Sequence, residues 1–112
     1  MEPELEPSVL ATLREQMGED YEPIRAIFEA ESGKHLEELR LGIETRSWER
    51  ARRAAHSLKS SAALFGLAGL SATMREVEHM PDATPPDAWR DRLARAQKQR
   101  ESGLAWLRDQ PK

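Results

Sequence analysis

No proline interrupts this 112-residue sequence between Pro23 and Pro81, a stretch that covers about half of its length. Proline lacks a backbone N–H and disrupts helix interiors, so this stretch can hold long, uninterrupted helices. Ala, Leu, Glu, Arg, Lys and Met dominate the chain, whereas Val, Ile, Thr and aromatic residues are sparse. The dominant residues are the ones that favour helices. The sequence therefore predicts an all-α fold.

Five segments carry apolar residues at every third or fourth position, the period of a helix with one buried face. We expect helices over residues 7–17, 20–45, 47–66, 67–80 and 85–109. Gly18 and Pro81 are stop signals, whereas Ser47 is a plausible N-cap and Pro85 suits a first helical position. Short connections make neighbouring helices antiparallel. The predicted architecture is an up-down-up-down four-helix bundle with a short extra N-terminal helix, in one domain spanning residues 1–112.

Charge and composition exclude several classes of function. The formal net charge of −3 argues against nucleic acid as the main partner. The absence of cysteine excludes a disulfide framework and thiol chemistry, and it suits the cytoplasm. The acidic start MEPELEPSVL does not resemble a signal peptide, and no apolar run approaches the roughly 20 residues of a membrane span. We expect a cytoplasmic protein that does not act on membranes.

The segment AAHSLKSSAALFG, residues 54–66, separates into two helix faces when successive residues are placed 100° apart. His56 lies on the face opposite the predicted buried stripe, with Lys59 and Ser60 one turn further on. Ser60, Ala63 and Gly66 are small, so this face is uncrowded. The predicted buried stripe consists of Ala51, Ala54, Ala55, Leu58, Ala62 and Phe65.

An exposed, uncrowded imidazole beside an ammonium is suited to accepting a phosphoryl group. A neutral imidazole is a nucleophile, and the charge of Lys59 favours the neutral form and can offset charge on phosphoryl oxygens. The alternative is an ordinary surface histidine. Residues 47–66 hold four cations and one carboxylate, a basic patch that favours an acidic partner, although these arginines could equally solvate the helix.

At these residues the sequence resembles the motif of histidine-containing phosphotransfer (Hpt) domains. The motif has a histidine, an apolar residue two positions on, a lysine three on, small residues from four on and a glycine ten on. Here those positions are His56, Leu58, Lys59, Ser60, Ser61 and Gly66. The helix count, the place of the histidine on the third helix and the length extend the resemblance over nearly the whole chain. One position departs from it, because the family often has glycine where this chain has Ser60.

The resemblance implies a phosphorelay intermediate. His56 would accept a phosphoryl group through Nε2 from an aspartate of a response-regulator receiver domain and pass it to another receiver, with Lys59 supporting the charge. The implied partners are receiver domains and a hybrid sensor kinase. The chain would be a monomeric phosphocarrier without an ATP-binding domain, a cofactor or a metal, since Mg²⁺ would belong to the receiver. The docking residues on this reading are Arg52, Ser60, Ala63, Leu64 and Gly66.

Two other functions stay open: a non-catalytic helical adaptor that binds through the basic face of the third helix, and a phosphate sink that has lost onward transfer. Leu64 could instead be packed by the first helix. His35 is interpreted as a partly buried core residue and His79 as a helix-end residue, and the histidines show no metal-ligand spacing. Glu76 and Glu78 are interpreted as a solvated helix face.

Overall fold

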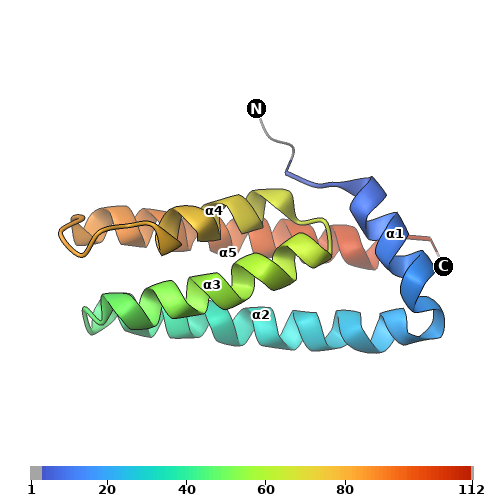
Figure 1. Ribbon diagram of the computed structural model, residues 1–112, viewed down its shortest axis with the longest axis horizontal. Helices are drawn as coiled ribbons and strands as arrows, with labels where there is room; N and C mark the ends of the chain where they lie inside the picture. The colour runs from blue at the N-terminus through green and yellow to red at the C-terminus, as the bar shows by residue number, and fades with distance from the viewer. Residues whose placement is uncertain (1–3, 112) are drawn as a thin grey trace.

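The computed structural model describes residues 4–111 and confirms the all-α prediction, since every regular element in that range is helical (Figure 1). The predicted helix ends agree with the observed ones to within two residues. A 3₁₀ turn between the first two helices is the one element that the sequence did not predict. The elements are α1 (Pro7–Met17), η1 (Gly18–Asp20), α2 (Tyr21–Glu44), α3 (Trp48–Leu64), α4 (Ala68–Glu78) and α5 (Pro86–Arg108).

Helices α2 to α5 lie side by side, and α1 crosses one end of them (Figure 1). Helices α2 and α3 run in opposite directions, as two contacts between them show. Phe28 of α2 stacks on Phe65 just after α3, with ring centroids 4.6 Å apart, whereas Gly42 near the end of α2 meets Ala51 near the start of α3. A Cβ on Gly42 would lie 2.8 Å from the Ala51 nitrogen, so glycine permits this close approach.

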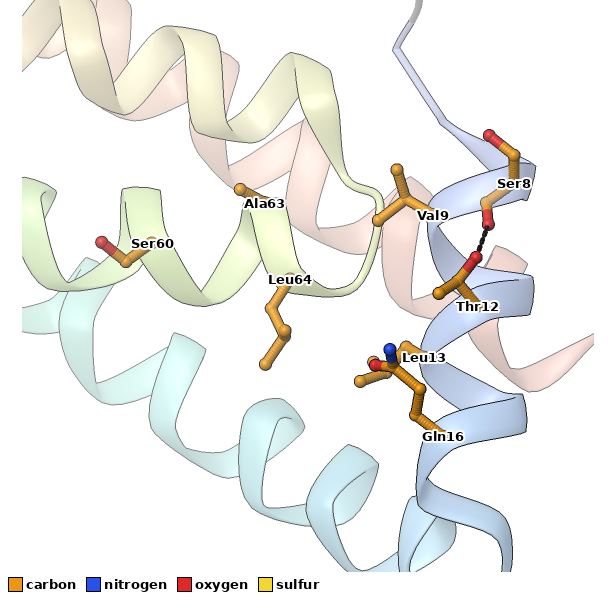
Figure 2. Close-up of a pocket in the computed structure, with 8 residues that line it drawn as sticks. All are labelled: Ser8, Val9, Thr12, Leu13, Gln16, Ser60, Ala63 and Leu64. Carbon is orange, nitrogen blue, oxygen red and sulfur yellow. Dashed lines mark hydrogen bonds between the residues drawn. The ribbon is translucent and has the colours of Figure 1, made fainter.

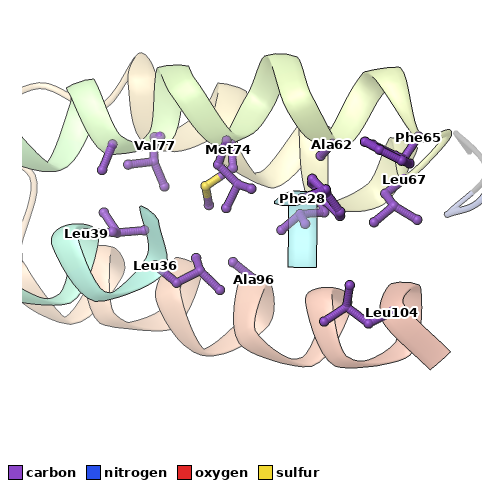
Figure 3. Packing of buried hydrophobic residues seen from close by; sticks show 14 of the residues in the cluster. Phe28, Leu36, Leu39, Ala62, Phe65, Leu67, Met74, Val77, Ala96 and Leu104 are labelled. Atoms are coloured by element: carbon purple, nitrogen blue, oxygen red, sulfur yellow. The ribbon is translucent and has the colours of Figure 1, made fainter. Parts of the chain in front are cut away.

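The core runs along the inside of the bundle formed by α2 to α5 (Figure 3). All six residues of the predicted α3 stripe are buried, which confirms that part of the sequence reading. Four of them are alanines, and such small side chains allow neighbouring helices to pack closely against α3. Because α3 buries this stripe in the core, the opposite face of the helix is exposed to solvent.

The turn between α3 and α4 fixes the position of α1. Gly66 has a φ of +78°, and a Cβ there would lie 2.7 Å from the Glu6 carbonyl oxygen. The Glu6 N–H donates to the Gly66 carbonyl at 2.8 Å, and the Gly69 N–H donates to the Glu4 carbonyl at 3.0 Å. The segment before α1 is therefore bonded to the turn that ends α3, and α1 begins beside it.

Helices α2 to α5 each begin one residue later than predicted, and two of these starts are informative. The last helix begins at Pro86, one residue later than expected, because the residue before a proline avoids the α region; Pro85 accordingly has φ −57° and ψ 140°. Ser47 does occupy the N-cap position of α3, but its side chain makes no capping hydrogen bond.

No helix in residues 4–111 combines the length and apolarity needed to cross a membrane.

Candidate functional site

The imidazole of His56 stands on the outer face of α3, near the middle of the helix. Its side chain is 64% exposed, as the spacing of the buried stripe predicts. Ser60 follows one turn later on the same face and is also exposed; its hydroxyl donates to the His56 carbonyl at 3.5 Å, the outer limit of a hydrogen bond. The ring is therefore open to a large partner.

Glu78, at the end of α4, binds both the histidine and the lysine of the motif. Its Oε2 lies 2.7 Å from His56 Nδ1, and the Lys59 ammonium lies 2.5 Å from Oε1 and 3.3 Å from Oε2. The hydrogen bond from Lys59, and then the one from His56, lower the pKa of Glu78. An ionised carboxylate can only accept hydrogen bonds, so the proton in this contact belongs to Nδ1. In the neutral imidazole Nε2 is then the nitrogen without a proton, and its lone pair is directed away from Glu78.

The interpretation of Glu78 as part of a solvated face is wrong. Its side chain is only 20% exposed and is held between α4 and α3. Glu76, two residues earlier, is different: it pairs with Arg92 and Arg95 of α5 at 3.0 Å each, on the surface. Sequence reasoning missed Glu78 because its contact depends on the register between two antiparallel helices. The only available signal was its place beside Val77, at the edge of the apolar stripe of α4.

The predicted basic patch is largely neutralised by neighbouring elements. Arg50 pairs with Glu38 of α2 at 2.7 Å, and Lys59 pairs with Glu78. Arg52 donates to the Met80 carbonyl at 3.0 Å, pairs with Asp82 and lies over the Trp89 ring. Arg53 is the exception among these four cations. Its side chain is 77% exposed, and its one ion pair, with Glu49, has a separation of 3.8 Å.

Three of the five residues expected to dock a partner lie together. Ser60, Ala63 and Leu64 form one wall of an open groove of about 610 Å³ (Figure 2). Leu64 is 52% exposed, so α1 does not cover it. The other wall comes from α1 and consists of Ser8, Val9, Thr12, Leu13 and Gln16.

The structure places the other two predicted docking residues apart from this groove. Gly66 is buried beneath Glu6. Arg52 is held on the loop between α4 and α5 by its contacts with Met80 and Asp82. Their contacts are internal ones that shape the fold around the site, so the candidate docking surface does not extend to them.

No group of three or more His, Cys, Asp or Glu side chains able to hold a metal ion occurs within residues 4–111. His35 is half-buried on α2, as expected. His79 follows α4 directly, and its Nδ1 lies 2.8 Å from the Arg75 carbonyl oxygen. His56 is thus the histidine whose surroundings combine exposure with a carboxylate and an ammonium.

Comparison with known proteins bears on the fold and the family. A crystal structure of histidine-containing phosphotransfer protein B (HptB) from Pseudomonas aeruginosa PAO1 has the same fold, with a TM-score of 0.85 and 21% identity over 96% of this chain and 94% of that one. No curated protein sequence matches. The family model of the Hpt domain matches residues 23–101, which include α3, α4 and the His56–Lys59–Glu78 cluster. The chain therefore belongs to the Hpt domain family.

Proposed function

We propose that this chain is a phosphorelay intermediate, which accepts a phosphoryl group on His56 from an aspartate of a receiver domain and passes it to the aspartate of another. One observation carries the proposal: Glu78 holds Nδ1 at 2.7 Å while the ring remains 64% exposed. The nitrogen left free is Nε2, and it is accessible. A nucleophile held in one tautomer by a hydrogen-bonded carboxylate is well suited to phosphoryl transfer to nitrogen.

In the proposed transfer, the Nε2 lone pair attacks the phosphorus of the aspartyl phosphate in line with the bond that breaks. The electron pair of the broken P–O bond stays on the aspartate carboxylate. His56 keeps its Nδ1 proton, so the ring becomes cationic, and the adjacent Glu78 carboxylate stabilises that charge. The reverse steps deliver the group to the next receiver. Lys59 contributes its positive charge from the side of Glu78.

The receiver is proposed to dock over the groove formed by Ser60, Ala63 and Leu64. On this proposal Ile27 of α2, which is 59% exposed and was not singled out from the sequence, would extend this surface. The Glu38–Arg50 pair gives a reference point from which positions along α2 and α3 can be compared. Ile27 lies 11 residues before Glu38, which is about 16 Å along α2 towards α1. Leu64 lies 14 residues after Arg50, which is about 21 Å along α3 in the same direction. The two exposed aliphatic side chains thus lie at similar levels.

Other parts of the proposal follow from the same assignment. The chain acts in the cytoplasm as a monomeric phosphocarrier, and its partners are receiver domains and a hybrid sensor kinase. The transfer needs no cofactor on this chain, since the Mg²⁺ that offsets phosphoryl charge is supplied by the receiver. The apolar groove beside His56 supports a protein partner, because large exposed apolar side chains rimmed by polar ones are typical of such surfaces.

The test is transfer from a phosphorylated receiver domain. The wild type and His79→Gln, which removes another exposed histidine, should take up acid-labile label, whereas His56→Gln should take up none. Label on His56→Gln equal to that of the wild type would refute the assignment. Receiver binding that persists in His56→Gln, with no transfer to any variant, would favour the adaptor. Uptake without return to a second receiver would favour the phosphate sink.

A further inference from the structure

We propose that Arg53 and Ser60 hold the oxygens of the phosphoryl group once it is on Nε2 of His56. This inference rests on the proposed function and specifies which side of the ring receives the group. Its basis is that the two flanks of His56 on α3 differ in charge, pairing and exposure.

Helix geometry separates the two flanks. At 100° per residue, Lys59 and Arg52 lie about 60° and 40° to one side of His56, whereas Arg53 and Ser60 lie about 60° and 40° to the other. Lys59 contacts Glu78 of α4, and Arg52 contacts the carbonyl of Met80 just after α4. The first side is therefore the α4 flank, and Arg53 and Ser60 occupy the opposite one.

The orientation of the ring directs the phosphoryl group to that opposite flank. Nδ1 faces Glu78 at 2.7 Å, and Nε2 is on the other edge of the imidazole. A phosphoryl group bonded to Nε2 therefore projects away from the Glu78 carboxylate, which would repel it. The Lys59 ammonium is already bound to both oxygens of Glu78, at 2.5 and 3.3 Å, and remains on the α4 flank.

Arg53 and Ser60 are both available for new contacts. The pair of Arg53 with Glu49 is 3.8 Å long, and the two side chains are 77% and 84% exposed, so breaking it costs little. Among the described residues 4–111, the one hydrogen bond of Ser60 Oγ is its 3.5 Å contact with the His56 carbonyl. Both residues are one turn from His56, where side chains on a helix meet.

The chemistry of the two side chains suits a phosphoryl group. A guanidinium can donate two parallel hydrogen bonds to phosphoryl oxygens and carries a fixed positive charge. The serine hydroxyl supplies a third donor. The serine at a position where relatives often have glycine then has a specific role: it adds a hydrogen bond while remaining small enough for the partner to approach.

Phosphoramidate, a small phosphoryl donor, tests this without a partner protein. Nε2 forms the bond to phosphorus, the P–N bond of the donor breaks, and the protonated amine leaves as ammonia with that electron pair. We expect Arg53→Gln to slow uptake about 5- to 10-fold and Arg53→Lys to recover part of the loss, because lysine keeps the charge but not the paired donors. Ser60→Ala and Ser60→Gly should each slow it about 2- to 3-fold.

Arg50→Gln is the matched control, because it removes the same charge from the same helix at a position held by Glu38. Uptake by Arg53→Gln within 1.5-fold of that by Arg50→Gln, at about equal helix content by circular dichroism, would overturn the assignment of Arg53. Faster uptake by Ser60→Gly would show that Ser60 obstructs the site. If the wild type takes up the phosphoryl group and the Arg53 and Ser60 variants do so at the same rate, this inference alone is refuted. If the wild type takes up no phosphoryl group on His56, the proposed function is refuted with it.

Discussion

The two flanks of His56 are built differently. On the α4 flank, Arg52 and Lys59 are held by Asp82 and Glu78, and both side chains are about three-quarters buried. On the opposite flank, which we call the groove flank, the small residue Ser60 is followed by the half-exposed Leu64, and both line the open groove beside α1. The contrast indicates a division of tasks: the α4 flank orients the ring, and the groove flank is left for the partner.

The largest expected effect tests what holds α1 beside the groove flank. Gly66→Ala should lower the free energy of unfolding by about 2–3 kcal/mol, because alanine disfavours a φ of +78° and its Cβ would lie 2.7 Å from the Glu6 carbonyl. Urea denaturation measures this loss. Gly18→Ala is the control for backbone strain alone: Gly18 has a φ of +52° and a ψ of −122° but no atom near its Cβ position, so about 1–2 kcal/mol is expected. Equal losses would show that the Glu6 contact does not anchor α1.

The next effect is confined to the groove flank. Leu64→Glu should slow transfer from a phosphorylated receiver about 10- to 30-fold, because it places a charge in the proposed apolar contact. Uptake from phosphoramidate should change less than about 2-fold, since the small donor needs no docking surface. Ala105→Glu, at an exposed position on α5, is the control and should leave both rates unchanged. An equal decrease in the rate of uptake from both donors would mean that Leu64 helps to position the His56 ring and does not contact the partner.

Features set by one helix at a time were predictable from sequence. The helical period alone predicts both the buried stripe of α3 and the exposure of His56 on the opposite face, and the structure has both. Gly66 was identified from its place in the motif, but its buried contact with Glu6 depends on a segment sixty residues away in the chain. The period of a helix says which face a residue is on, and nothing about which distant segment covers it.

Features set between helices were not predictable. Glu78 binds His56 and Lys59 because α4 is antiparallel to α3 at one particular register, and no local pattern specifies that register. The same limitation applies to the basic patch. The cations of α3 were counted without the carboxylates that Glu38 of α2 and Asp82 of the α4–α5 loop bring to them. Charge along one helix therefore overestimates the charge that a partner meets.

A smaller effect distinguishes two adjacent arginines, one on each flank. Arg52→Gln should lower the free energy of unfolding by about 1–2 kcal/mol, because it removes a charged hydrogen bond to the Met80 carbonyl and the contact with the Trp89 ring. Arg53→Gln should change it by less than about 0.5 kcal/mol, since Arg53 is exposed. Urea denaturation of both variants makes the comparison. A larger loss of unfolding free energy in Arg53→Gln than in Arg52→Gln would show that Arg53, and not Arg52, has the structural role.

The smallest effect concerns the charge of Glu78. Glu78→Gln can still accept the Nδ1 hydrogen bond but cannot pair with Lys59, so a loss of about 0.5–1 kcal/mol is expected at pH 7. Folding lowers the pKa of Glu78, so its contribution is complete above the unfolded-state pKa of about 4.3 and disappears as the pH falls through the folded value. The difference between wild type and variant in urea denaturation should therefore decrease steadily as the pH is lowered below that unfolded-state value. A difference that does not decrease would show that shape, and not the charge shared with Lys59, fixes Glu78 beside the ring.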